Sequence, residues 1–242
     1  MFRHRGHTRT LSHNLQIASL LSFVAGVVNV VGFLAVHRLT TNVTGHFAFV
    51  MEEVLHLQWW KGFVYFLYVF FFFIGSFTSG FLVEWISSRS ERYMYAVPAL
   101  IECAILVLVG LSGLHWWETN PDALAYSLLF AMGLQNSLVT TISSANVRTT
   151  HLTGLFTDLG IELSQVFFYK THDQKAKLRS SMRLRFTIIV FFFTGGIVGG
   201  LLYGSLGLHV LALSGALLFF GLIYDSIKFR IIQVSRRMKN NL

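Results

Sequence analysis

Two short polar stretches carry the residues of this chain that are best suited to bind a solute. The first is Thr40-Thr41-Asn42-Val43-Thr44-Gly45-His46, and the second is Thr149-Thr150-His151-Leu152-Thr153-Gly154. Thr and Asn are good caps for the start of a helix, and glycine lets a backbone approach a bound molecule closely. A helix that starts inside a membrane protein presents unpaired N–H groups and a partial positive charge. Two such starts that meet near the middle of the membrane would form a site for an anion or a polar solute.

The same residues also have a purely structural interpretation. Thr44 and Thr153 would then cap helices at the membrane surface, and Asn29 and Asn136 would join helices by hydrogen bonds. Both interpretations stay open at the level of the sequence. The candidate solute-binding residues are Asn42, Thr44, Gly45, His46, His151, Thr153 and Gly154, together with Asn29 and Asn136 in the preceding apolar runs.

Three acidic residues are candidates for proton coupling: Glu102, Asp158 and Glu162. Glu102 lies in the middle of an apolar run, where a lipid-facing carboxylate would cost roughly 2.5–3.5 kcal/mol, so it must face protein or water. It either couples proton movement or is protonated and hydrogen-bonded to a neighbouring helix. Asp158 and Glu162 are four residues apart, on one face of a helix whose positive start would favour acids on structural grounds alone.

The two polar stretches belong to a longer internal repeat. Residues 40–61 align with residues 149–170, with seven identities in 22 positions. Upstream, Gly26-Val27-Val28-Asn29 matches Gly133-Leu134-Gln135-Asn136 as Gly-x-x-Asn. The sequence therefore predicts two copies of one unit within a single transmembrane domain, 1–242. Repeat A covers about residues 13–115 and repeat B about residues 122–228.

The composition is typical of a membrane protein. Apolar residues make up 54% of the chain and charged residues 12%, and the mean hydropathy is +0.59. An ordinary soluble domain carries about 25% charged residues. A net charge of +8 would suggest nucleic acid in a soluble protein, but here the basic residues flank apolar runs and no aromatic-basic groove accompanies them. The single cysteine, Cys103, excludes a disulfide framework.

Six apolar runs are predicted to cross the membrane, at residues 15–36, 62–86, 96–114, 123–143, 186–203 and 208–227. The apolar part of the first Thr-Gly segment, 43–57, is too short for an ordinary span. The sequence thus predicts an all-α, polytopic integral membrane protein with six transmembrane helices and two broken or re-entrant half-helices. Basic tails at 1–12 and 229–242 and a basic loop at 170–185 complete the chain.

The basic residues favour six crossings over eight. If the N-terminus is cytoplasmic and each half-helix enters and leaves on one face, 17 of the 19 Lys and Arg residues lie inside, with Arg38 and Lys61 outside. If both half-helices cross, the split falls to 15 against 4. The positive-inside bias therefore predicts six spans with both termini cytoplasmic. Three spans per copy, an odd number, make the copies inverted repeats, as in many secondary transporters.

Several runs carry a resemblance to a known family. In repeat B they are Ala131-Met132-Gly133-Leu134-Gln135-Asn136, Ala145-Asn146-Val147-Arg148-Thr149-Thr150-His151-Leu152-Thr153-Gly154 and Thr157-Asp158-Leu159-Gly160; in repeat A they are Ala25-Gly26, Gly32-Phe33 and Asn42-Val43-Thr44-Gly45. They resemble the YoaK family of bacterial multi-spanning membrane proteins, whose domain has no assigned function, over roughly residues 15–228. The resemblance implies a protein of the bacterial inner membrane that is suspected to be a permease, and it brings no established substrate. This chain departs from the family pattern at His46, where Asn is frequent.

The expected function is that of a secondary transporter or channel-like permease for a small polar or anionic solute, with proton coupling as an option. The duplication, the broken segments and the intramembrane acid favour it. A membrane-embedded scaffold or sensor without transport is the alternative, and an intramembrane enzyme is a third option. No His-x-x-x-His, Gly-x-Ser-x-Gly or paired metal-ligand motif is present, so we expect no enzyme, no cofactor and no metal. The expected partners are the lipid bilayer and a small solute, without nucleic acid; a homo-oligomer is a further option.

Overall fold

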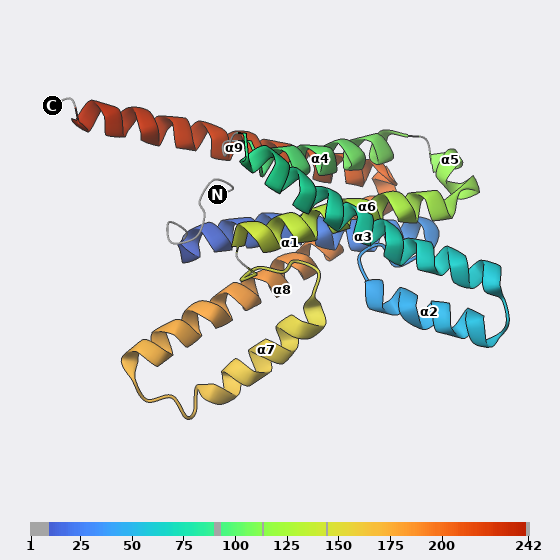
Figure 1. Cartoon of the computed structure of the whole chain (residues 1–242), viewed down its shortest axis with the longest axis horizontal. Helices are drawn as coiled ribbons and strands as arrows, with labels where there is room; N and C mark the ends of the chain where they lie inside the picture. The colour runs from blue at the N-terminus through green and yellow to red at the C-terminus, as the bar shows by residue number, and fades with distance from the viewer. Residues whose placement is uncertain (1–9, 90–92, 113, 144, 241–242) are drawn as a thin grey trace.

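The computed structural model describes residues 10–89, 93–112, 114–143 and 145–240, and every regular element in these ranges is a helix. The helices are α1 (Leu11–Val36), α2 (Val43–Leu55), α3 (Trp59–Ser87), α4 (Ala96–Leu111), α5 (Leu114–Thr119), α6 (Pro121–Ser143), α7 (Leu152–Gln165), α8 (His172–Leu206) and α9 (His209–Asn240). The long helices form a bundle from which two hairpins project, one made by α2 and α3 and the other by α7 and α8 (Figure 1). The predicted all-α class is confirmed.

Four helices are long and apolar enough to cross a membrane, namely α1, α3, α6 and α8. The helix α4 and the apolar part of α9, His209–Asp225, are shorter apolar helices. The half-helices α2 and α7 contain 13 and 14 residues, which rise only about 20 Å. That is less than the roughly 30 Å of a hydrocarbon core. The chain is therefore a helical membrane protein, and its α2 and α7 are shorter than an ordinary membrane span.

Two predicted boundaries are wrong. The helix α8 begins at His172 rather than near residue 186, so most of the segment predicted as a basic loop is helical. Thr171 starts it, because its Oγ1 accepts a hydrogen bond from the backbone N–H of Gln174 at 3.4 Å. Similarly, α9 continues to Asn240, through most of the segment predicted as a C-terminal tail. Both segments are rich in Lys, Arg and Gln, which are good helix formers. Of the other predicted tail, 1–12, residues 1–9 lie outside the described residues, and its last two residues begin α1.

The two most extensive helix contacts, α1 with α8 and α3 with α6, are built from one motif. Each helix carries Phe-x-x-Gly where it crosses its partner. An added Cβ on any of the four glycines would lie 2.0–2.1 Å from the carbonyl oxygen of the partner's Phe. The first and last residues of the four motifs are Phe23 and Gly26 on α1, Phe192 and Gly195 on α8, Phe72 and Gly75 on α3, and Phe130 and Gly133 on α6. The missing side chains thus let the helix backbones touch.

Both of these helix pairs run parallel. Past the α1–α8 crossing, Gly199 faces Val27 and Val31. Past the α3–α6 crossing, Ser76 Oγ donates to the Gly133 carbonyl at 3.1 Å, and Gly80 faces Ser137. Later residues of one helix therefore meet later residues of the other. Since α1 and α3 come from the first half of the chain and α8 and α6 from the second, each half packs mainly on the other.

Two further pairs run antiparallel. In the α4–α9 pair, Gly110 faces Ala212, while Gly215 faces Cys103. In the α1–α6 pair, Gln135 near the end of α6 bonds the carbonyl of Leu21 early in α1. The opposite ends of these two helices meet where Gly32 faces Leu128. These directions constrain how the chain threads a membrane.

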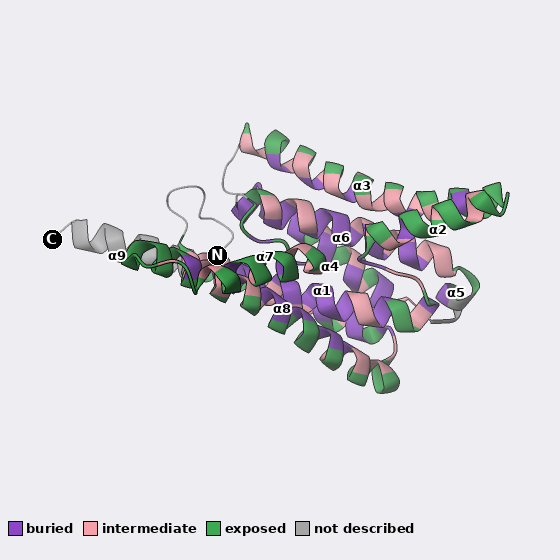
Figure 2. Ribbon diagram, turned by 90° about the horizontal axis from the view of Figure 1, so that it is seen from below, coloured by how far each residue is buried: buried purple, intermediate pink, exposed green. Residues whose placement is uncertain are grey.

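The core of the bundle is formed by α1 and α6. Their most apolar stretches are 61% buried, against 22% for α3 and 33% for α8. Figure 2 shows α1 and α6 mostly buried in the middle, with the exposed residues on the outer faces of α3 and α8. On α3 these outer residues include Phe73, Phe77 and Phe81. A phenylalanine-rich outer surface is the expected surface of a protein surrounded by acyl chains.

Candidate functional site

The segment before each half-helix is held by an asparagine on the preceding long helix. Thr41 Oγ1 donates to Asn29 Oδ1 at 2.6 Å, and Thr150 Oγ1 donates to Asn136 Oδ1 at 3.0 Å. Asn29 and Asn136 are the matching residues of the Gly-x-x-Asn repeat, so the two halves make the same bond. Sequence reasoning included both asparagines among the site residues but omitted their threonine partners. The signal was present, since both threonines belong to the aligned Thr-Thr pairs.

A second bond in each half involves the other threonine of the pair. Thr40 Oγ1 donates to the Val28 carbonyl at 3.1 Å. In the second half, Thr149 Oγ1 accepts from Gln135 Nε2 at 3.0 Å, and the same amide group donates to the Leu21 carbonyl at 3.0 Å. Gln135 occupies the repeat position of Val28. Its Oε1 is buried and has no hydrogen-bond partner within the part of the chain that the structure describes.

Both Asn–Thr clusters lie close to the helix crossings. Asn29 follows Gly26 by three residues, and Asn136 follows Gly133 by three; three residues rise about 4.5 Å along a helix. The N-terminal ends of α2 and α7 therefore start beside the middle of the bundle, where their free N–H groups and partial positive charge are available. Non-helical backbone at such a depth requires protein cover, which the Thr and Asn bonds supply.

The two half-helix starts are separate in the described structure. Each is bonded to its own preceding helix, α2 packs on α3, and α7 packs on α8. Along α1, the second cluster is level with Leu21 and the first with Asn29. These residues are eight apart, or about 12 Å. The predicted meeting of the two starts at a single point therefore stays a prediction, and the structure shows two clusters on one α1–α6 pair.

The N-cap residue of each half-helix lies two positions before the threonine of its Thr-Gly pair. Asn42 Oδ1 accepts from the Gly45 backbone N–H at 3.0 Å. His151 holds the corresponding position before α7 without a side-chain cap bond. Thr44 and Thr153 lie inside the first turns with exposed side chains, so the alternative that these two threonines are the caps is wrong.

Gly45 and Gly154 face side chains of their own segments. An added Cβ on Gly45 would lie 2.5 Å from Leu39 Cδ1, and one on Gly154 would lie 2.3 Å from His151 Cδ2. Both neighbours are ends of side chains that can rotate away. The backbone contacts that demand glycine lie instead at the four glycines of the two Phe-x-x-Gly crossings and at Gly110 in the α4–α9 pair.

His46 is fully buried and anchors the loop that precedes α2. Its Nε2 donates to the Leu39 carbonyl at 2.6 Å, and its ring lies 4.6 Å from that of Tyr68 and 6.4 Å from that of Tyr65. Its other ring nitrogen, Nδ1, has no hydrogen-bond partner among the residues that the structure describes. This environment suits a residue that fixes the turn back into the bundle more than one that is open to a solute.

Glu102 is fully buried in α4, and neither carboxylate oxygen has a hydrogen-bond partner among the described residues. The structural alternative for this residue was a protonated carboxyl bonded to a neighbouring helix, and no such bond is present. An isolated carboxylate in a dry interior is very costly, so the group is held uncharged. Its candidate role in proton coupling stays a prediction.

Asp158 and Glu162 are paired with Arg185 of α8. The guanidinium donates to Asp158 Oδ2 at 3.2 Å and to Glu162 Oε1 at 2.5 Å, and it also donates to Ser181 Oγ. Sequence reasoning missed Arg185, because it lies in the segment that was read as a loop. Acids neutralised in this way join α7 to α8, which makes them weaker candidates for proton coupling than Glu102.

The first half of the chain has an aromatic pair at the corresponding place. Phe49 aligns with Asp158 in the repeat, and its ring lies 5.2 Å from that of Tyr65 on α3. Tyr65 precedes the crossing glycine of α3 by ten residues, as Arg185 precedes that of α8. The two hairpins therefore use the same positions with different chemistry, one apolar and one ionic.

A family model described as a protein of unknown function (DUF1275) matches residues 17–224. The chain belongs to the DUF1275 family. This is the family called YoaK-like, so the resemblance found in the sequence is confirmed. No curated protein and no solved structure matches the chain.

Besides the two Asn–Thr clusters, this DUF1275 chain has a polar cluster where α1 ends and α6 begins, and sequence reasoning missed it. The buried Tyr68 donates its hydroxyl hydrogen to Asp122 Oδ1, and Arg38 Nε lies 3.3 Å from Tyr68 Oη and 3.6 Å from Asp122 Oδ1. Partial burial lowers the pKa of Arg38, but the Tyr68 bond and the Asp122 charge outweigh it and raise the pKa above its ordinary value. The guanidinium therefore stays charged.

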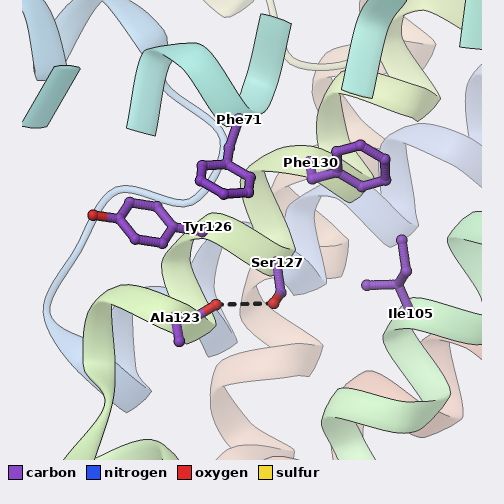
Figure 3. A pocket seen from close by; sticks show the side chains of 6 residues that line it. All are labelled: Phe71, Ile105, Ala123, Tyr126, Ser127 and Phe130. Atoms are coloured by element: carbon purple, nitrogen blue, oxygen red, sulfur yellow. Dashed lines mark hydrogen bonds between the residues drawn. The ribbon is translucent and has the colours of Figure 1, made fainter. Parts of the chain in front are cut away.

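One pocket opens beside this cluster, with a cavity volume of about 380 Å³. It is lined by Phe71 of α3, Ile105 of α4, and Ala123, Tyr126, Ser127 and Phe130 of α6. Figure 3 shows the aromatic rings and Ile105 around the space, with Ser127 donating to the Ala123 carbonyl, a bond of 2.8 Å. Volume and lining are those of a small-molecule site. Within the described residues no group of three His, Cys, Asp or Glu side chains is placed to hold a metal ion.

Proposed function

We propose that this DUF1275 protein is a secondary transporter or channel-like permease for a small polar or anionic solute. In this proposal it consists of two inverted repeats with six membrane spans, and α2 and α7 are re-entrant half-helices. It lies in the bacterial inner membrane with both termini in the cytoplasm. The half-helix starts bind the solute, and Glu102 is the group that couples protons.

The directions of the helices are the observation that carries the proposal. If α2 and α7 both crossed the membrane, α4 and α9 would run in the same direction, and so would α1 and α6. The contacts of Gly110 with Ala212 and of Gln135 with Leu21 make both pairs antiparallel. If α2 and α7 turn back instead, the expected directions match the structure in all four helix pairs: α1–α8 and α3–α6 are parallel, and α4–α9 and α1–α6 are antiparallel. An odd number of spans per half then follows, which is what inverted repeats require.

The solute site follows from the two Asn–Thr clusters. Each cluster fixes the start of a half-helix, and each start offers N–H donors and a partial positive charge to an anion or to a polar oxygen. The first half adds Asn42 and Gly45, and the second half adds His151 and Gly154. Because repeats of opposite orientation place one start on each side of the midplane, the solute would pass from one start to the other.

Cysteine labelling tests the topology. Single cysteines at Gln58 and Arg38, in a Cys103→Ser background, are expected to react with a membrane-impermeant maleimide added to the outside of intact cells, because both positions lie on the outer face of the six-span arrangement. A cysteine at Ser180, in the helical extension of α8, is expected to react only after the cells are opened. Labelling of Gln58 from the cytoplasmic side alone would establish eight crossings and remove the inverted repeat.

Uptake into proteoliposomes tests the solute site. We expect protein-dependent uptake of at least one probe from a panel of chloride, nitrate, phosphate, urea and glycerol. The double variant Asn29→Ala/Asn136→Ala is expected to lose at least 90% of that uptake. The threonine hydroxyls before both half-helices then lose the asparagine oxygens to which they donate, so neither start is held in place. The matched control is Asn120→Ala, which removes an exposed asparagine at the start of α6 and is expected to transport normally. If no probe enters faster than into empty liposomes, the scaffold alternative gains.

A further inference from the structure

The position that corresponds to the pocket residue Ser127 is occupied by a large side chain in the other half of the chain. The helix crossings align α1 with α6, which places Leu20 at the position of Ser127. Leu20 packs directly on α9, because an added Cβ on Gly221 would lie 2.5 Å from Leu20 Cδ2. At the pocket, the residue of α6 that faces α3 and α4 is the small Ser127, so the space between these two helices is left open. These two helices make few contacts with each other, so the pocket opens sideways toward lipid.

The pocket walls are apolar and aromatic. Phe71 and Tyr126 stack with their ring centroids 4.7 Å apart, and Phe130 and Ile105 close the other side (Figure 3). The Ser127 hydroxyl is already engaged with the Ala123 carbonyl. Aromatic faces carry negative charge density, so walls of this kind attract organic cations.

An acid without a partner among the described residues lies one helical turn before a residue of the pocket wall. Glu102 precedes the lining residue Ile105 by three positions on α4, which puts their Cβ atoms about 5–6 Å apart on neighbouring faces of one helix. The Glu102 carboxyl is fully buried and both oxygens lack partners. Glu102 thus lies within one helical turn of a residue that lines the pocket.

We propose that the pocket binds a lipophilic organic cation that enters from the membrane, with Glu102 as its counter-ion. The buried carboxyl can hold one positive charge, either its proton or the ligand. Binding therefore exchanges the two: the O–H bond of the Glu102 carboxylic acid breaks, its proton leaves to water, and the carboxylate pairs with the cation. No other bond forms or breaks.

The other titratable groups near the pocket do not replace Glu102. Asp122, at the outer end beside Ala123, is already bonded by Tyr68 and lies beside Arg38. On α9, His209 Nδ1 bonds the Gly110 carbonyl at 2.8 Å. The remaining described groups on α4 and on the helices packed against it are Cys103, Tyr126, Tyr224, Asp225, Lys61, Tyr65 and Glu84. None of them is hydrogen-bonded to Glu102.

This site shares Glu102 with the proposed transport function, but it is separate from the half-helix starts, and its occupation does not require transport. Binding is measured in lipid nanodiscs without any gradient, with empty nanodiscs as the blank. A failure of the uptake experiment leaves the binding result unchanged, and the reverse also holds.

The test compares two ions of the same shape and opposite charge, tetraphenylphosphonium and tetraphenylborate. After the nanodisc blank is subtracted, the cation is expected to bind at least tenfold more tightly than the anion. Calorimetry in buffers of different ionisation enthalpy is expected to show about one proton released for each cation bound. Equal binding of the two ions, or no proton release, overturns the proposal.

Three variants locate the site. Ser127→Leu fills the pocket with the side chain that the other half carries at the same position, so the fold is expected to tolerate it, and cation binding should fall at least tenfold. Ser127→Ala keeps the space and is expected to bind within twofold of wild type. Glu102→Gln should bind the cation at least tenfold more weakly and release no proton, while its melting temperature reports folding. Unchanged cation binding by Ser127→Leu places the ligand elsewhere and overturns the proposal.

Discussion

Replacing Gly133 by alanine is expected to destabilise the protein by about 3 kcal/mol, the upper end of the range for overpacking. The added Cβ would lie 2.1 Å from the Phe72 carbonyl oxygen of α3, and a backbone atom cannot rotate away as a side chain can. The α3–α6 crossing must therefore open along its whole length. The expected result is a large fall in melting temperature, measured by tryptophan fluorescence in detergent, with much of the protein lost on size-exclusion chromatography.

The matched control is Gly204→Ala in the last turns of α8. No atom lies within 4 Å of an added Cβ there, and alanine is a better helix former than glycine by about 1 kcal/mol. This variant is expected to be as stable as wild type or slightly more so. If Gly133→Ala melts like the control, the helices do not touch at this crossing in the membrane protein.

Removal of Arg185 is the second change with a large expected effect. Arg185→Met leaves Glu162 without its partner, and the side chain of this acid is only 12% exposed. Breaking such a pair from one side costs roughly 3–5 kcal/mol, because an uncompensated charge stays behind. The α7–α8 hairpin is expected to separate, which limited proteolysis after Lys170 and a lower melting temperature would both report.

Two further variants separate the ion pair from simple loss of packing. The double variant Arg185→Met/Glu162→Leu is expected to recover most of the lost stability, because an apolar pair can replace a buried ionic one. Asp158→Asn changes a side chain that is 52% exposed, and it is expected to cost at most about 1 kcal/mol. If the double variant is no more stable than Arg185→Met, the unpaired charge of Glu162 is not the cause of the stability lost in Arg185→Met.

The parts of the fold that could be predicted from the sequence are those with a local signal. The aligned Thr-Gly stretches predicted the two short helices, and Gly-x-x-Asn predicted two matching asparagines. Apolar runs predicted the long helices to within a few residues at most ends. These signals depend only on neighbouring residues, so they survive without knowledge of contacts.

The helix crossings were missed although their motif is visible in the printed sequence. The run Phe71-Phe72-Phe73-Ile74-Gly75 matches Phe191-Phe192-Phe193-Thr194-Gly195, at a spacing of 120 positions rather than 109. The second half therefore carries an insertion of 11 residues between the half-helix and the crossing. The insertion coincides with the basic helical extension of α8, which the sequence predicted as a loop. A repeat search at one fixed spacing therefore loses the match between the two halves at this extension.

The partners of the charged residues could not be predicted, because they depend on three-dimensional placement. Arg185 meets Asp158 and Glu162 only because α8 folds back on α7. Glu102 is different, since its position in an apolar run already indicated that it faces the interior. What the sequence could not show is that no neighbouring helix offers it a hydrogen bond.

The exchange of helices between the two halves has a consequence for synthesis. Gly195 follows Gly26 by 169 positions, and chains grow at about 5–20 residues per second. The first helix therefore waits roughly 10–30 s in the membrane before its main partner is made. During that interval the narrow glycine face of α1 is open to lipid or to other newly inserted helices. An insertion factor that shields such a face would raise the yield of this protein more than that of one whose neighbouring helices pair as they emerge.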